Sequence, residues 1–177
     1  TGMPIKTKVR TIPNYPKPGI MFRDITTLLK DPIGFRLTID TLAERYASMD
    51  IQTVIGIESR GFVLGAPLAY ALGVGFVPIR KRGKLPAATI GCDYELEYGS
   101  DRVEIHTDAI QAQERVLLID DLIATGGTAW AAVALIEQMG AQLVEAAFVI
   151  NLPDIGGMAR LQAQGVACHA LTEFEGD

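Results

Sequence analysis

The amino-acid sequence predicts an α/β fold in which helices cover both faces of a mostly parallel, twisted sheet. Short apolar runs that are typical of strands alternate along the chain with segments of helical periodicity. Most of these strand runs are continuously apolar, as expected for strands that are buried on both faces. The length of 177 residues suits one hydrophobic core, so we expect residues 1–177 to form a single domain.

The first half of the pattern begins with a helix at Asp31–Pro32, where Asp31 can cap the helix and Pro32 can occupy its first turn. The apolar residues of this helix share one face: Phe35, Ile39, Leu42, Ala43 and Tyr46. A strand over 53–59, a helix over 61–73 and a strand over 74–79 follow. Residues 62–79 are all uncharged, but glycines and a proline interrupt them, which favours a helix, a turn and a strand over a membrane span.

The second half of the pattern is interrupted from Arg80 to Ser100, where charges, a proline and glycines predict a loop. Residues 102–106 alternate like a half-exposed strand. The remaining predicted elements are a strand over 115–120, a helix from about 128 to 139, a strand over 143–150, a short helix over 157–164 and a last strand over 166–171.

Composition and charge exclude several classes of function. The net charge of -5 argues against a general nucleic-acid binder and against a membrane-surface protein. The chain has two cysteines, Cys92 and Cys168, and two histidines, at spacings that do not match a zinc site. We therefore expect free thiols and a cytoplasmic location.

The stretch "VLLIDDLIATGGTA" at 116–129 carries the clearest chemistry. It places two acids at the end of an apolar strand and a Thr-Gly-Gly-Thr loop before a helix, where backbone N–H groups can hold a phosphate. The acids Asp120 and Asp121 suit ribose hydroxyls or a hydrated Mg²⁺. The pattern therefore predicts a site for a ribose 5-phosphate, although an isolated loop of this kind is also compatible with a plain turn.

This stretch resembles the phosphoribosyl pyrophosphate (PRPP) motif of type I phosphoribosyltransferases. "IPNYPKPGIMFRDITTLL" (12–29), "GIESRGF" (56–62), "IRKRGKLP" (79–86) and "YELEYG" (94–99) are similar in order and position to the adenine phosphoribosyltransferase family. "NLPDIGG", after the strand over 143–150, matches that family only loosely. The resemblance implies a small hood built from the N-terminal segment and the region after 150. It also implies a reaction that converts adenine and PRPP into AMP and pyrophosphate.

The resemblance also assigns roles to residues. It implies PRPP binding by Asp120, Asp121, Ala124, Thr125, Gly126, Gly127 and Thr128, and pyrophosphate binding by Ser59, Arg60, Arg80 and Lys84. It implies an adenine pocket at Met21, Phe22, Arg23 and Leu152, in which the backbone around Arg23 reads the base. Core packing of Phe22, and a solvated charge run at 80–84, are the alternatives. The peptide between Glu58 and Ser59 is expected to be cis.

Glu97 is the residue that the resemblance implies for handling the proton of adenine, with Tyr98 beside it in a loop that closes over the site. Glu95 is a competing candidate, because strand alternation places both acids on one face.

The resemblance further implies Mg²⁺ that is bound mainly through PRPP, with no direct protein ligand, and a homodimer. A related purine enzyme of the xanthine type and a non-catalytic PRPP-binding regulator are the alternatives.

Overall fold

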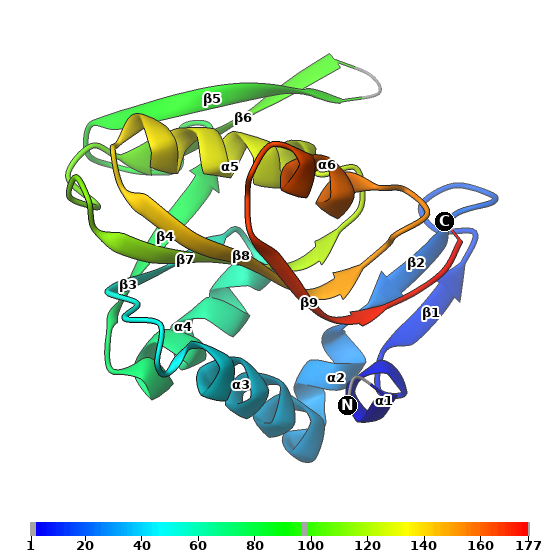
Figure 1. Cartoon of the computed structure of the whole chain (residues 1–177). Helices are drawn as coiled ribbons and strands as arrows, with labels where there is room; N and C mark the ends of the chain where they lie inside the picture. The colour runs from blue at the N-terminus through cyan, green and yellow to red at the C-terminus, as the bar shows by residue number, and fades with distance from the viewer. Residues whose placement is uncertain (1–2, 97–98, 177) are drawn as a thin grey trace.

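The computed structural model describes residues 3–96 and 99–176 and is built around a seven-stranded sheet (Figure 1). The strand order is β5-β6-β4-β3-β7-β8-β9. The parallel strands are β3 (Thr53–Ile57), β4 (Gly75–Lys81), β7 (Arg115–Ile123), β8 (Gln142–Asn151) and β9 (Cys168–Glu173). At the edge, β6 (Gly99–His106) pairs antiparallel with β4 and with β5 (Thr89–Leu96). The predicted mostly parallel α/β class is confirmed.

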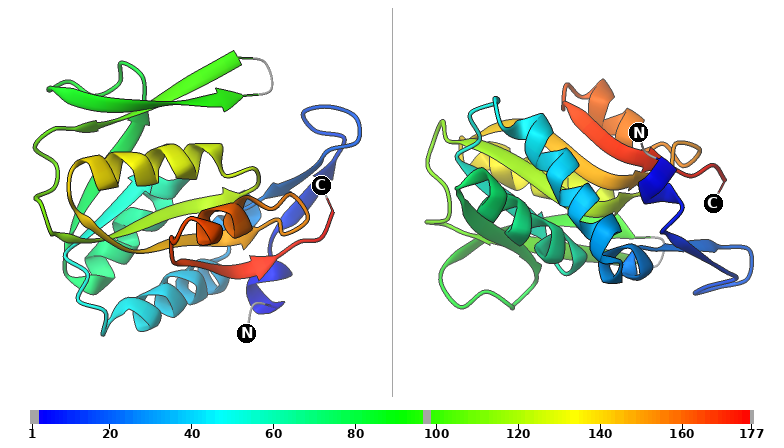
Figure 2. Two further views of the ribbon diagram at one scale, coloured as in Figure 1. Left: turned by 45° about the horizontal axis from the view of Figure 1, so that its top comes forward. Right: turned by 90° about the horizontal axis from the view of Figure 1, so that it is seen from below.

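Helices cover both faces of this sheet, as predicted. The helices α3 (Pro32–Tyr46) and α4 (Arg60–Leu72) lie on one face, and α5 (Gly127–Gln138) and α6 (Gly157–Ala163) lie on the other (Figures 1 and 2). Successive residues of β7 point to opposite faces: Val116 and Leu118 belong to the core beneath α5, whereas Leu117 and Ile119 belong to the core beneath α4. Burial on both faces explains why this strand is continuously apolar.

Elements before residue 31 were not predicted by the pattern. The structure has a short helix α1 (Met3–Lys6), a two-stranded antiparallel sheet of β1 (Arg10–Pro13) and β2 (Met21–Asp24), and a helix α2 (Thr26–Lys30). Each is only four or five residues long, which is too short for a helical or strand period to stand out.

The predicted helix boundaries are largely confirmed. The Asp31 carboxylate accepts a hydrogen bond of 2.8 Å from the Gly34 N–H and caps α3. Gly73 ends α4 in the left-handed conformation, with φ 72°. The uncharged run over 62–79 forms most of α4, a turn and part of β4, and none of the described helices is long and apolar enough to cross a membrane.

Two sequence predictions were wrong. The predicted loop from Arg80 to Ser100 contains the end of β4 and the whole of β5, whose partly exposed residues are held by pairing with β6 and show no apolar run. The strand predicted over 115–120 continues to Ile123, because β8 still pairs with it through Leu122 and Ile123. Asp120 and Asp121 therefore lie within β7 and not at its end.

Candidate active site

A cavity of about 660 Å³ lies where β3, β7 and β8 end. Parallel strands bring their carboxyl ends to one edge of the sheet, so segments far apart in the sequence meet there. The cavity lining includes predicted site residues from four segments: Met21, Phe22 and Arg23; Ser59 and Arg60; Asp120, Asp121, Ala124, Thr125, Gly126, Gly127 and Thr128; and Leu152. The structure thus brings most of the predicted residues together, while their roles stay predictions.

The loop at 124–128 has the geometry of an anion cradle. Gly126 adopts the left-handed conformation with φ 88° and stands at the N-cap of α5. A glycine has no side chain with which to cap the helix, so the N–H groups of the first turn stay available to a ligand. The positive end of α5 therefore faces the cavity and favours a phosphate.

Two residues that the sequence analysis missed hold this loop in place. The Gly157 N–H donates to the Ala124 carbonyl at 2.9 Å, and the Arg160 guanidinium donates to the Thr125 carbonyl at 2.9 Å. A Cβ atom at Gly157 would overlap the backbone of Ala124, Thr125 and Gly126. The start of α6 therefore packs on the loop at a distance that only glycine permits. The pair Gly156–Gly157 in "NLPDIGG" was the available signal.

The two acids of the motif differ in their surroundings. The Asp121 carboxylate is nearly buried and forms an ion pair with the Arg60 guanidinium. Burial and the neighbouring Asp121 charge raise the pKa of Asp120 well above its ordinary value. The two neighbouring carboxyl groups offer oxygens that can form hydrogen bonds with adjacent hydroxyl groups of a sugar.

A second helix N-terminus opens into the same cavity. Helix α4 begins at Arg60, and its N-cap residue Ser59 makes no capping hydrogen bond with its side chain. The peptide between Glu58 and Ser59 is cis, as the resemblance implied. Because β3 and β7 are adjacent and parallel, α4 and α5 present two anion-binding ends at one edge of the sheet.

Arg80 and Lys84 reach the cavity through Glu58, a lining residue that the sequence analysis also missed. The Glu58 carboxylate accepts hydrogen bonds from Arg80 Nε at 3.2 Å, from the Lys81 N–H at 2.8 Å and from Lys84 Nζ at 2.9 Å. Burial opposes its ionisation, but these donors outweigh burial and lower the pKa of Glu58. Arg80 and Lys84 are therefore anchored beside the predicted pyrophosphate subsite by Glu58, although the Lys84 side chain is still about half exposed to solvent.

The apolar part of the cavity has two walls. On one side Phe22 lines the cavity and meets Tyr15 edge to face, with ring centroids 5.2 Å apart. On the other side lie Leu152, which is 5% exposed, and Ile155. Among the described residues, Phe22 belongs to neither core cluster. This placement favours a ligand wall over core packing for Phe22.

Glu97 and Tyr98 lie outside the described residues. Glu95 is exposed and lines a separate cavity of about 450 Å³ together with Trp130 and Arg160. This cavity adjoins the candidate site, because Thr125, Gly126 and Gly127 line both, but Glu95 does not itself line the candidate site.

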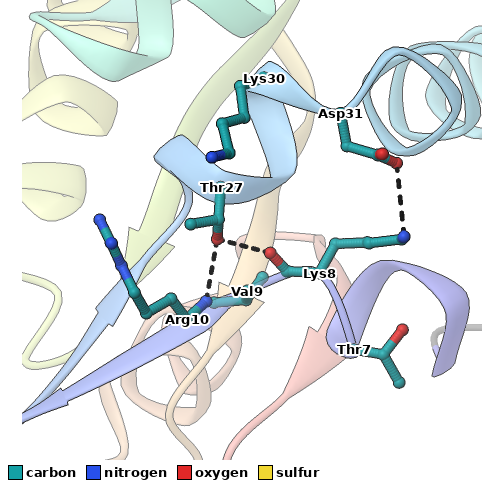
Figure 3. A pocket seen from close by; sticks show the side chains of 7 residues that line it. All are labelled: Thr7, Lys8, Val9, Arg10, Thr27, Lys30 and Asp31. Atoms are coloured by element: carbon teal, nitrogen blue, oxygen red, sulfur yellow. Dashed lines mark hydrogen bonds and ion pairs between the residues drawn. The ribbon is translucent and has the colours of Figure 1, made fainter.

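A further hollow of about 430 Å³ lies near the N-terminus, between α1, β1 and α2 (Figure 3). Several of its polar groups already have partners within the chain. Lys8 lies 3.8 Å from Asp31, and the Thr27 hydroxyl donates to the Lys8 carbonyl and accepts from the Arg10 N–H. The Arg10 guanidinium pairs with Asp24. The larger cavity, with its two helix N-termini, is therefore the better candidate site.

Comparisons with known proteins agree with this geometry. Residues 24–160 match the phosphoribosyl transferase domain family. An adenine phosphoribosyltransferase of Nitrosospira multiformis is 68% identical over 175 residues, which is 99% of this chain and 100% of that relative. The crystal structure of adenine phosphoribosyltransferase from Rhodothermus marinus is similar with a TM-score of 0.91 and 47% identity, over 98% of each chain.

A Saccharomyces cerevisiae adenine phosphoribosyltransferase, solved with an imino-altritol bisphosphate and adenine, gives a TM-score of 0.90 and 42% identity over 96% of this chain and 97% of that one. These matches extend over almost the whole of this chain. The chain therefore belongs to the phosphoribosyltransferase family and, within it, to the adenine phosphoribosyltransferases.

Proposed function

We propose that this enzyme transfers the 5-phosphoribosyl group of PRPP to N9 of adenine and produces AMP and pyrophosphate. The observation that carries the proposal is a single cavity that joins two helix N-termini to a pair of apolar walls. A ligand that matches this cavity has a phosphate at each end of a sugar and a flat base beside it.

Each part of the cavity has a place in the reaction. The 5-phosphate lies on the loop at 124–128, and the ribose hydroxyls meet Asp120 and Asp121. The pyrophosphate lies at the start of α4 beside Arg60, with Arg80 and Lys84 within reach. Adenine lies between Phe22 and Leu152. This arrangement holds N9 next to C1 of the ribose, which lowers the entropic part of the barrier.

In the chemical step the bond between C1 and the pyrophosphate oxygen breaks and a bond from N9 to C1 forms. The leaving pyrophosphate keeps the electron pair, and the N–H groups and cations around Ser59 and Arg60 stabilise its charge. The proton of adenine leaves as the new bond forms, and we assign its transfer to Glu97.

Magnesium fits this scheme as an ion that is carried mainly by the diphosphate oxygens of PRPP. In the ranges 3–96 and 99–176, no group of three or more His, Cys, Asp or Glu side chains is arranged to hold a metal ion. Mg²⁺ commonly keeps several waters and binds through substrate phosphates and one or two carboxylates, and Asp120 and Asp121 are the carboxylates nearest to such a complex. The ion would offset the negative charge of the diphosphate.

The proposal includes a single domain whose hood comes from the N-terminal segment and the region after 150, a homodimer and a cytoplasmic location. The hood and the dimer rest on the family resemblance. The location rests on two cysteines, Cys92 and Cys168, both of which are free thiols.

A base screen tests the proposed activity directly. The enzyme is supplied with PRPP, Mg²⁺ and one base at a time, and pyrophosphate release is measured for adenine, hypoxanthine, guanine and xanthine. We expect turnover with adenine to exceed the others by about 10² or more, because a 6-oxopurine reverses donor and acceptor at two ring positions. Preferential turnover of xanthine would support the xanthine-type alternative. PRPP binding without turnover of any base would support the other alternative, a non-catalytic PRPP-binding regulator.

A further inference from the structure

The C-terminal segment, residues 173–176, lies against both walls of the predicted base pocket. It continues from the end of β9 and runs beside the β1–β2 hairpin, where the red and blue ends of the chain meet in Figures 1 and 2. The hairpin supplies one wall through β2, and the loop after β8 supplies the other.

The contact with the first wall is made by Arg23. Its guanidinium lies over the Phe174 ring, 4.6 Å from the centroid, and donates to the Glu175 carbonyl at 3.2 Å. It also donates to the Thr11 hydroxyl at 2.7 Å, which fixes it to β1. Lys6 Nζ lies 4.9 Å from the same ring. The ring of Phe174 therefore attracts cations from two N-terminal elements.

The contact with the second wall is made by hydrogen bonds to the loop after β8. Asn151 Nδ2 donates to the Glu173 carboxylate at 2.8 Å, and the Phe174 N–H donates to the Asn151 carbonyl at 3.2 Å. The Gly176 N–H donates to the Asp154 carboxylate at 2.6 Å. These bonds flank Leu152, so the segment is tied to Asn151 before this wall residue and to the Asp154 side chain after it.

We propose that residues 173–176 act as a clasp that sets the spacing of the two walls, with Arg23 and Phe174 as positioning residues for the base. This inference rests on the proposed function. A flat base is held by contact on both faces, and a gap of about 0.5–1 Å on one side forfeits a quarter to a half of the attraction there. The clasp has no contact with the loop at 124–128 or with the start of α4 among its described bonds, so it acts on the base and leaves PRPP binding alone.

The test replaces Phe174 and measures the KM of each substrate separately. For Phe174→Ala we expect the KM for adenine to rise about threefold to tenfold, the range of a partly buried cation–π contact, with the KM for PRPP changed by less than about twofold. Phe174→Tyr keeps the ring and should restore the wild-type value. Phe35→Ala is the matched control, because Phe35 is also a half-buried ring packed against the same hydrophobic core, but it belongs to α3 and is not one of the clasp residues 173–176.

Arg23→Ala and the double variant Arg23→Ala/Phe174→Ala complete a double-mutant cycle with Phe174→Ala and the wild-type enzyme. If the two residues act as one clasp, the double variant should raise the KM for adenine scarcely more than either single variant. Additive effects, or equal rises in both KM values for Phe174→Ala, would overturn the clasp. A wild-type enzyme that fails to convert adenine would overturn the proposed function instead, so the two failures are distinguishable.

Discussion

Gly157→Ala is a small change with a large expected effect on PRPP binding. A Cβ atom at this position would lie 2.6 Å from the Thr125 carbonyl carbon and 2.7 Å from the Gly126 nitrogen, whereas ordinary contact begins at 3.4 Å. Both neighbours are backbone atoms, so the loop and α6 must separate by about 0.8 Å, at a cost of about 1–3 kcal/mol in the free energy of unfolding. A displacement of about 1 Å can cost about 10² in rate, so we expect kcat/KM for PRPP to fall by about that factor.

The measurement varies PRPP at saturating adenine and adds a calorimetric titration with ribose 5-phosphate. Gly75→Ala is the matched control: it adds the same methyl group, and no atom of the described residues lies within 4 Å of the new Cβ position. The control should keep wild-type kinetics. If Gly157→Ala binds ribose 5-phosphate as tightly as the wild type, then α6 does not set the position of the loop.

Two further predictions concern carboxylates. Glu97→Gln should lower kcat by about 10²–10⁴ with PRPP affinity nearly unchanged, whereas a fall of that size in Glu95→Gln would move the proton-transfer role to Glu95. Glu145→Gln should lower the free energy of unfolding by about 1–3 kcal/mol, because Arg45 and the buried Tyr46 hydroxyl lose their charged partner. Burial opposes ionisation of Glu145, but these two donors lower its folded pKa, so this stability is present above the unfolded pKa and lost as pH falls through the folded value. Denaturant melts should therefore show the difference between variant and wild type at neutral pH and a smaller one in acid; a difference that does not depend on pH would contradict the assignment.

The central sheet was predictable because both faces of its inner strands are buried. Ile55 and Leu118 point to the core beneath α5, and Val54 and Leu117 point to the core beneath α4, so consecutive residues in the middle of these strands are apolar. The phosphate loop was predictable for a local reason as well. Left-handed backbone at the start of a helix requires glycine, and Gly126 stands at that position.

The parts that sequence reasoning missed depend on contacts between distant segments. Strand β5 pairs with β6, and its apolar residues Ile90, Cys92, Tyr94 and Leu96 do alternate, but Gly91 and the charged residues around the strand made the segment resemble a loop. Glu58 looks like any polar residue after a strand until β4 brings Arg80 and Lys84 to it, 22 and 26 residues later. The pair Gly156–Gly157 is visible in the sequence, but the reason for Gly157 follows only from the approach of α6 to the loop at 124–128.

The two helix N-termini divide the cavity into subsites that can be tested separately with fragments of the substrate. If α5 holds the 5-phosphate and α4 holds the pyrophosphate, then PRPP should bind more tightly than either ribose 5-phosphate or pyrophosphate, because the second contact becomes intramolecular. Gly127→Val adds a branched side chain to the first turn of α5, next to the loop, and its Cβ would lie 3.3 Å from a Tyr94 ring carbon, a contact that a small shift of the ring can relieve. This variant should lose ribose 5-phosphate and PRPP while pyrophosphate binding stays near the wild-type value. Arg60→Ala removes a cation from the α4 subsite and should show the reverse preference between the two fragments. Calorimetric titration of the three ligands into each variant measures this, with thermal melts to verify folding. Equal weakening of both fragments by Gly127→Val would mean that the phosphates share one subsite, and the assignment of the two helices would then fail.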